Sequence, residues 1–151
     1  TDPLPTPLKS ALGLGTIALF ALYTLTLAPT VHWLDSGEVS AAAFSLSNPH
    51  PPGEPLWVIL AKLIALIPIG DIAYRINLAS AVAGALVFPA TFFCFWTWTS
   101  PSASSSPGTA PPAPPQRSPR SINLLFIAAL APTLTYPRWV QGIRGEVYAL
   151  N

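Results

Sequence analysis

Charged residues are scarce in this sequence. Lys, Arg, Asp and Glu make up 9% of its 151 residues, against about 25% in a typical soluble domain. Apolar residues make up 51%, and the mean hydropathy is +0.49. These values predict an integral membrane protein. The formal net charge of +1 excludes the strongly basic surface of a nucleic-acid-binding protein, so we expect no nucleic-acid partner.

Cysteine and methionine are also nearly absent. The single cysteine, Cys94, excludes an intramolecular disulfide framework and a thiolate-rich metal site. The sequence contains no methionine, so none stands at position 1, and it stops abruptly in the segment EVYALN (146–151). We therefore expect the chain to be a part of a longer protein.

Long apolar runs take the place of the missing charge. No charged residue occurs in segment 10–34, and about 20 helical residues at ~1.5 Å each cross the ~30 Å hydrocarbon layer. A second full-length run covers 76–98, and a third, shorter run covers 122–137, where Pro132 is expected to kink the helix. A signal peptide is the alternative for the first run, but its length and the lack of an A-x-A cleavage site favour a span. We predict an all-α fold, a polytopic bundle of transmembrane helices.

A short apolar segment, PLWVILAKLIALIPIG (55–70), lies between the first two spans. It is too short to cross a membrane alone, and Lys62 interrupts it. We expect a short helix in the membrane interface after the first external loop, with the Lys62 ammonium reaching the headgroups. Asp71 follows this segment, and we expect it to cap the second spanning helix and to pair with Arg75 one turn later.

Composition divides the chain into three regions. Residues 1–99 hold the first two spans and the first external loop (32–55), and residues 100–121, rich in Pro and Ser, are expected to form a disordered cytoplasmic loop. Residues 122–151 hold the third span and the start of a second external region. Apolar residues of that last region repeat at the spacing of an amphipathic helix: Val140, Ile143, Val147 and Leu150.

The positions of the basic residues predict the orientation. Lys9, Arg117 and Arg120 flank the first span or lie in the Pro/Ser loop, and cytoplasmic loops carry the excess of Lys and Arg. With three spans, segments 32–75 and 138–151 then share the opposite face. Five of the six acidic residues lie in those two segments: Asp35, Glu38, Glu54, Asp71 and Glu146.

The first external loop gathers chemically active side chains. Asp35 and Glu38 fit a capping box, in which Asp35 caps a helix and Glu38 reaches back to its start. A carboxylate held at a helix N-terminus is also rigid and ionised near neutral pH, which suits a general base, and both interpretations stay open. His50 begins a stiff His-Pro-Pro-Gly turn that either fixes the entry into the next helix or aims His50 at a ligand phosphate or acceptor. These three residues could form a metal site, but their spacing matches no strong motif and we predict none.

Arginine and glutamate follow the third span. Arg138 and Arg144 either anchor a helix end at the headgroups or hold a lipid phosphate through bidentate hydrogen bonds. Glu146 lies two residues after Arg144, so the two side chains would not share one face of a helix.

Four motifs occur in a fixed order: DSGE (35–38), HPPG (50–53), RINLASA (75–81) and EVYALN (146–151). In this combination, segments 26–86 and 141–151 resemble a family of polytopic membrane proteins related to protein O-mannosyltransferases, within the GT-C glycosyltransferases. The resemblance implies inverting transfer of a sugar, with mannose one candidate, from a polyprenyl-phosphate carrier to a hydroxyl on the non-cytoplasmic face. It implies membrane lipid and the lipid-linked sugar as partners and a protein or glycan acceptor. The resemblance indicates no cofactor beyond that donor. In particular, it indicates no divalent metal.

The resemblance also implies roles for individual residues. GT-C enzymes carry an essential acid in the first external loop, where Asp35 stands here with Glu38 beside it, so Asp35 would remove the acceptor proton. The leaving phosphate needs cations or hydrogen-bond donors. The candidates for that role are His50, Arg75, Arg138 and Arg144. Glu146 and Tyr148 of the closing motif would line the same pocket.

Two other functions compete with glycosyl transfer. A transporter or flippase would use charged groups at midplane depth, where only Lys62 comes close, in a helix too short to span. A non-catalytic membrane scaffold would not need acids clustered in one external loop. The compact HPPGEPLW loop favours a bacterial inner membrane, with the endoplasmic reticulum membrane as the alternative.

Overall fold

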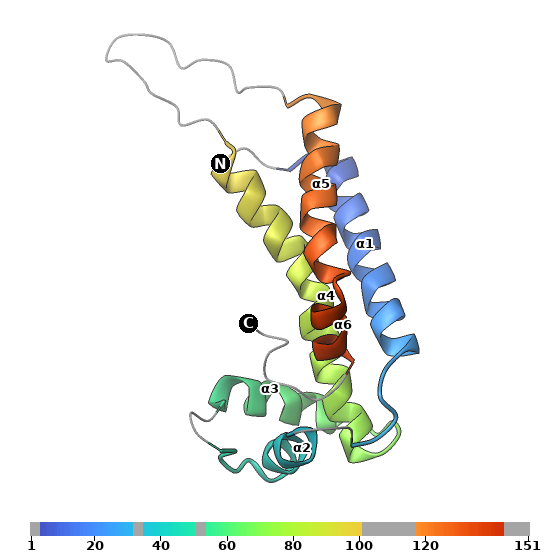
Figure 1. Ribbon diagram of the computed structural model, residues 1–151, viewed down its shortest axis with the longest axis vertical. Helices are drawn as coiled ribbons and strands as arrows, with labels where there is room; N and C mark the ends of the chain where they lie inside the picture. The colour runs from blue at the N-terminus through green and yellow to red at the C-terminus, as the bar shows by residue number, and fades with distance from the viewer. Residues whose placement is uncertain (1–3, 32–34, 51–53, 101–116, 144–151) are drawn as a thin grey trace, which may run out of the picture.

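Six α-helices make up the part of the chain that the structure, a computed structural model, describes: residues 4–31, 35–50, 54–100 and 117–143. The helices are α1 (Thr6–Leu25), α2 (Ser36–Ser45), α3 (Pro55–Ala65), α4 (Ile72–Trp98), α5 (Pro119–Thr133) and α6 (Tyr136–Gly142). The described ranges contain no strand, which confirms the all-α prediction. The long helices α1, α4 and α5 run along the molecule, while α2 and α3 lie across one end (Figure 1).

Within the described ranges, two helices are long and apolar enough to cross a membrane. They are α1, with 20 residues, and α4, with 27 residues. The third predicted span, residues 122–137, is divided between two helices, because α5 has 15 residues and ends at Thr133, and the chain becomes helical again at Tyr136. Its place in a membrane stays a prediction. Pro132 lies in the last turn of α5, so the expected kink is a break between two helices. The complete polytopic bundle remains a prediction.

Aromatic rings and a glycine bring the long helices together. Phe88 and Phe92 of α4 are fully buried, and Phe126 of α5 meets them edge-on with ring centroids 4.9 and 6.3 Å away. Gly15 of α1 packs against the same cluster, where a Cβ atom would lie 2.7 Å from Phe88 Cε1. Close van der Waals contact of this kind is a main source of helix association in lipid.

Tyr23 joins α1 to the break between α5 and α6. Its hydroxyl donates to the Thr133 carbonyl at 2.6 Å. That carbonyl has no helical partner because the residue four positions later is Pro137, which lacks an N–H. Gly84 and Gly142 leave room for the Tyr23 ring, since a Cβ atom on either would lie 3.1 to 3.3 Å from it. The buried hydroxyl therefore satisfies an acceptor that the sequence leaves open.

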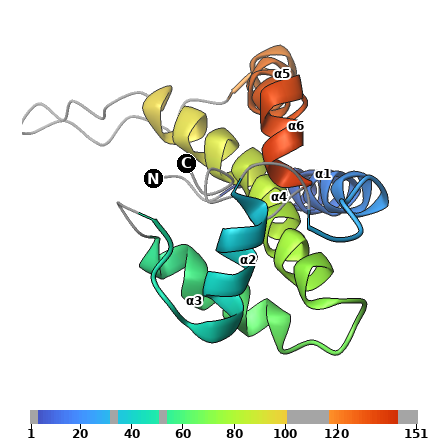
Figure 2. The same ribbon diagram turned by 60° about the horizontal axis from the view of Figure 1, so that its bottom comes forward.

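The end layer is a pair of helices packed on the first half of α4 (Figure 2). Its core combines small and medium side chains with one large ring, since Ala43, Ala61 and Ile76 are fully buried and Trp57 is 2% exposed. We expected the Lys62 ammonium to reach the lipid headgroups, but it is directed toward α2 instead. The ammonium donates to the Phe44 carbonyl near the end of α2 and lies 4.6 Å from the centroid of the Phe44 ring. A cation near a helix C-terminus complements the partial negative charge there, so Lys62 connects α3 to α2.

The turn between α3 and α4 is fixed by polar contacts. Asp71 accepts a hydrogen bond from the Tyr74 N–H at 2.7 Å, which confirms the predicted cap of α4. The predicted pair of Asp71 with Arg75 is wrong. The Arg75 guanidinium instead donates, at 2.9 to 3.2 Å, to three backbone carbonyls: Ala65, Ile69 and Gly70. Arg75 thus satisfies carbonyls that the end of α3 leaves open.

Basic residues lie at the end of the molecule opposite α2 and α3. The N-terminal parts of α1 and α5, which carry Lys9 and Arg120, both lie at that end (Figure 1). Arg117 donates to the Trp96 carbonyl at 2.7 Å and lies 4.1 Å from the centroid of the Trp96 ring, at the C-terminus of α4. Lys9, Arg117 and Arg120 thus lie away from the acidic residues of the α2 and α3 end, although Lys62 and Arg75 belong to that acidic end. Of residues 100–121, predicted as a disordered loop, 101–116 fall outside the described residues, and α5 begins within the remaining part, at Pro119.

Two glycines of α1 provide a matched test of the helix packing. Gly13→Ala places its methyl in open space, since nothing lies within 4 Å, and we expect about 0.5–1 kcal/mol of stabilisation from replacing a helical glycine. Gly15→Ala must displace the buried Phe88 ring, and overpacking costs about 1–3 kcal/mol. Thermal unfolding in detergent should show a lower midpoint for Gly15→Ala than for Gly13→Ala. Equal midpoints would contradict the α1–α4 contact.

Candidate functional site

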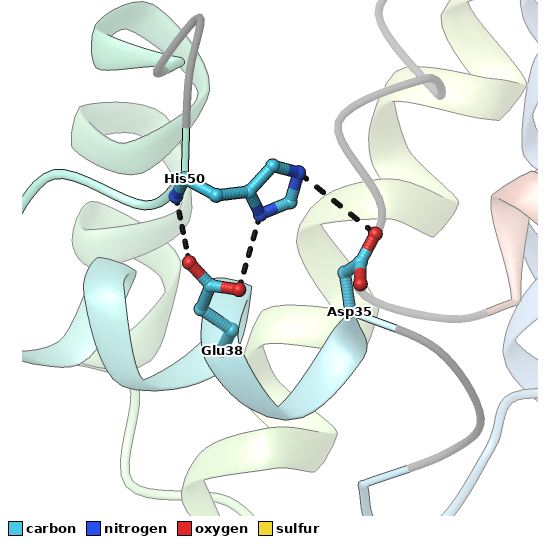
Figure 3. A group of neighbouring side chains, drawn as sticks. All are labelled: Asp35, Glu38 and His50. Carbon is cyan, nitrogen blue, oxygen red and sulfur yellow. Dashed lines mark hydrogen bonds and ion pairs between the residues drawn. The ribbon is translucent and has the colours of Figure 1, made fainter.

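Asp35, Glu38 and His50 come together beside α2. Asp35 directly precedes the helix, Glu38 lies in its first turn, and His50 follows it in the chain (Figure 3). Glu38 Oε1 accepts a hydrogen bond from the His50 backbone N–H at 2.6 Å, and Glu38 Oε2 lies 3.0 Å from His50 Nδ1. His50 Nε2 lies 3.9 Å from Asp35 Oδ2. The structure thus unites the three polar residues of the first external loop that the sequence singled out.

The capping-box interpretation of Asp35 and Glu38 is wrong. Asp35 occupies the N-cap position of α2, but its side chain makes no capping hydrogen bond. Its backbone dihedrals, φ −81° and ψ 1°, differ from the extended conformation typical of a capping residue. Glu38 cannot reach back to the start of the helix because both of its carboxylate oxygens are directed to His50.

The environment separates the two carboxylates chemically. All three side chains of the cluster are about half exposed, at 49 to 53%. The His50 backbone N–H, followed by the His50 imidazole, holds the pKa of the Glu38 carboxyl below its usual range. Glu38 is therefore an ionised acceptor with both oxygens engaged. Asp35 has a longer contact with His50 and keeps its carboxylate open to an incoming group.

A buried amide fixes the chain segment that leads to Asp35. Asn77 of α4 is fully buried, and its Nδ2 donates to the carbonyls of Ala28 and Thr30 at 2.8 and 3.1 Å. The Ala28 N–H in turn donates to the Ile143 carbonyl at 2.9 Å. Sequence reasoning did not assign Asn77 a role. The sequence did contain a signal for it, namely an amide side chain within an apolar spanning segment. Such an amide needs hydrogen-bond partners and is usually functional.

The remaining predicted site residues are distributed differently. Arg75 bonds to the C-terminal end of α3, whereas His50 precedes its N-terminal end. Since 11 helical residues extend about 16 Å, Arg75 and His50 are not brought together, and phosphate binding by Arg75 stays a prediction. Arg138 lies in the first turn of α6, half-buried. Three further candidates lie outside the described residues: Arg144, Glu146 and Tyr148.

The cluster also has the atoms of a metal site. Asp35, Glu38 and His50 each offer one oxygen or nitrogen, and these atoms lie within 4.8 Å of one another. Such atoms bind divalent cations in many proteins. Here the imidazole and the Glu38 carboxylate instead satisfy each other directly. The described geometry is that of a hydrogen-bonded network.

Comparison with known proteins places these residues in a family. Residues 35–151 match the family described as the N-terminal domain of protein O-mannosyl-transferase TMEM260. The chain belongs to this family. The matched region begins at Asp35 and includes the whole cluster. The predicted relationship to O-mannosyltransferases is therefore confirmed.

The chain spans less than a fifth of the length of two relatives from the TMEM260 family. The mouse protein O-mannosyl-transferase TMEM260 is 34% identical over 150 residues, which cover 96% of this chain and 18% of the mouse protein. The Dictyostelium discoideum protein of the same name is 22% identical over 138 residues, covering 89% of this chain and 14% of that protein. No solved structure matches the chain. Both relatives are eukaryotic, so the preference for a bacterial inner membrane finds no support.

The contact between Glu38 and His50 predicts an acid-sensitive contribution to stability. Because the pKa of Glu38 is lowered in the folded protein, its contribution is present above the pKa of the unfolded chain and is lost as pH falls through the folded pKa. Glu38→Gln should therefore unfold at a lower temperature than wild type near neutral pH, and the difference should shrink in acid. Thermal scans from neutral to acidic pH measure this. A difference that does not change with pH would contradict the ionised contact.

The Asn77 amide predicts a second stability effect. Asn77→Asp keeps the shape but replaces the donor by an acceptor that faces two carbonyls, and we expect a loss of about 1–3 kcal/mol or more. Asn123→Asp is the matched control, since Asn123 is exposed near the start of α5. Thermal unfolding should show a drop of several degrees for Asn77→Asp. The unfolding midpoint of Asn123→Asp should stay near that of wild type. Equal midpoints for the two variants would show that Asn77 does not hold the segment that leads to Asp35.

Proposed function

We propose that this chain is the N-terminal part of a membrane glycosyltransferase that moves mannose from a polyprenyl-phosphate carrier to a protein hydroxyl. The observation that carries the proposal is the half-exposed Asp35 carboxylate, held at the start of α2 beside an engaged Glu38. The relatives named protein O-mannosyl-transferase support the sugar and the acceptor class. Since they are eukaryotic, we place the reaction at the endoplasmic reticulum membrane, on its non-cytoplasmic face.

Asp35 is the general base in this reaction. Its carboxylate removes the proton from the acceptor hydroxyl as the oxygen attacks the anomeric carbon of the sugar. The bond from that carbon to the phosphate oxygen breaks, and the configuration at the carbon inverts. Glu38 is less suited to this role because both of its oxygens already accept hydrogen bonds from His50.

A lipid-linked donor suits the end layer of the fold. The outer surface of α3 exposes the large apolar side chains of Leu56, Ile59 and Leu63 within the same layer as the cluster. An apolar surface of this kind favours a position in the membrane interface, where the phosphate of a polyprenyl carrier also lies. Arg138 and Arg144 are the candidates to neutralise that phosphate, with Glu146 and Tyr148 nearby in the chain. The proposal requires no cofactor beyond the lipid-linked sugar.

Loss of the Asp35 carboxylate should abolish transfer without unfolding the protein. We expect Asp35→Asn in the full-length protein to reduce transfer by about 10²–10⁴-fold, the usual contribution of a general base. Unfolding should change little, since Asp35 makes no capping hydrogen bond. The measurement is transfer of radiolabelled mannose from polyprenyl-phosphate mannose to acceptor protein in liposomes.

Glu54→Gln is the matched control, because it removes another carboxylate on the same side of the molecule outside the cluster. It should transfer at the wild-type rate. Undiminished transfer by Asp35→Asn would exclude Asp35 as the base. If wild type transfers from no lipid-linked donor but moves such a lipid across the bilayer, the protein is a flippase and the proposed function is wrong.

A further inference from the structure

His50 lies between two carboxylates of different character, and its tautomer follows from their positions. An ionised carboxylate can only accept hydrogen bonds, so Nδ1, 3.0 Å from Glu38 Oε2, carries the proton. In the neutral imidazole, Nε2 then presents a lone pair. That nitrogen lies 3.9 Å from Asp35 Oδ2, on the side of the ring facing away from Glu38 (Figure 3).

Helix α2 sets this arrangement. Asp35 and Glu38 are three residues apart at the start of the helix, a spacing that puts both carboxylates on one face. Glu38 also binds the His50 main chain, through the N–H at 2.6 Å. One carboxylate thus holds His50 at two points and limits the rotation of the ring. The third residue, Asp35, is left facing Nε2.

We propose that His50 accepts from Asp35 the proton taken from the acceptor hydroxyl, and that Glu38 is the positioning residue for His50. This inference rests on the proposed function. Asp35 gains the proton when the acceptor oxygen bonds to the sugar, and it passes the proton to His50 Nε2, which restores the Asp35 carboxylate. The resulting imidazolium lies between two carboxylates, which stabilise its charge. It then releases the proton to water, to which the half-exposed ring is open.

The resting distance is compatible with this role. A separation of 3.9 Å is longer than a hydrogen bond, and catalytic contacts are commonly long before substrate binds and shorten in the complex. Glu38 and His50 already form their contact, so only Asp35 has to move. The proposal differs from direct phosphate binding by His50. Phosphate binding would place His50 Nε2 against the phosphate of the lipid-linked sugar and not against Asp35.

Substitution of His50 separates proton transfer from binding. We expect His50→Ala and His50→Gln in the full-length protein to lower kcat by about 10–100-fold, with unchanged KM for donor and acceptor. Both variants keep the backbone N–H that binds Glu38, so the segment stays in place. Added imidazole should restore transfer by His50→Ala, because a free base can replace the missing ring. A side chain with a purely structural role would not respond to imidazole.

The role of Glu38 is tested in combination with His50. If Glu38 acts through the imidazole, Glu38→Gln should lower kcat in the wild-type background and add little loss in His50→Ala. ¹⁵N NMR of the wild-type imidazole gives an independent measure, with a protonated Nδ1 and an unprotonated Nε2 expected for the neutral ring. Glu38→Gln should weaken that preference.

Several results would overturn the proposed proton relay from Asp35 to His50. If wild type transfers mannose and Asp35→Asn does not, while His50→Gln matches wild type, the proposed function stands and the relay is wrong. A raised KM for the donor with unchanged kcat in His50→Ala would assign His50 to phosphate binding. Loss of wild-type activity in chelator, restored by a divalent cation, would make the cluster a metal site. If wild type transfers no sugar, the proposed function and this inference both fail.

Discussion

The hydrogen bonds from Asn77 to the Ala28 and Thr30 carbonyls tie the segment after α1 to α4, next to the end of the molecule where the candidate site lies. An amide buried in an apolar helix is costly unless its donors find partners, and an unpaired carbonyl is costly for the same reason. The chain that leaves α1 is therefore held against α4 at a defined place. Asp35 and α2 follow in the chain, and α2 itself packs on α3 and α4 through Val39, Ala42 and Ala43.

Tyr23 has a corresponding function where α5 gives way to α6. Pro137 removes the N–H that would have satisfied the Thr133 carbonyl, and the Tyr23 hydroxyl supplies the missing donor. The break turns the chain so that α6 packs on α4 beside the segment from Thr26 to Ala28, which Trp139 and Ile143 contact through hydrogen bonds. Tyr23 and Asn77 are buried polar side chains inside helices, and both connect elements that are distant in sequence.

Asp35 and Glu38 lie one helical turn apart at the start of α2. They acquire different properties because His50, which lies outside the helix, forms hydrogen bonds with Glu38 and only a longer contact with Asp35. His50 gives Glu38 two hydrogen bonds, which lower its pKa and occupy both oxygens, and it approaches Asp35 only at 3.9 Å. The result is one structural carboxylate and one available carboxylate in the same exposed cluster. In a glycosyltransferase of the proposed kind, this separates the base from the residue that organises its surroundings.

Sequence alone determined the features that depend on local periodicity and end signals. These are the all-α class, the two long apolar helices, the Asp71 cap and the gathering of acids and histidines near one segment. Only the tertiary structure decided which partner each polar side chain takes. Glu38 pairs with His50 across 12 positions, Arg75 with carbonyls of the α3–α4 turn, and Asn77 with carbonyls 47 and 49 positions away. A capping motif or an i to i+4 pair is visible in sequence, but buried donors and acceptors compete across the whole fold, and the partner is set by which backbone groups packing leaves unsatisfied.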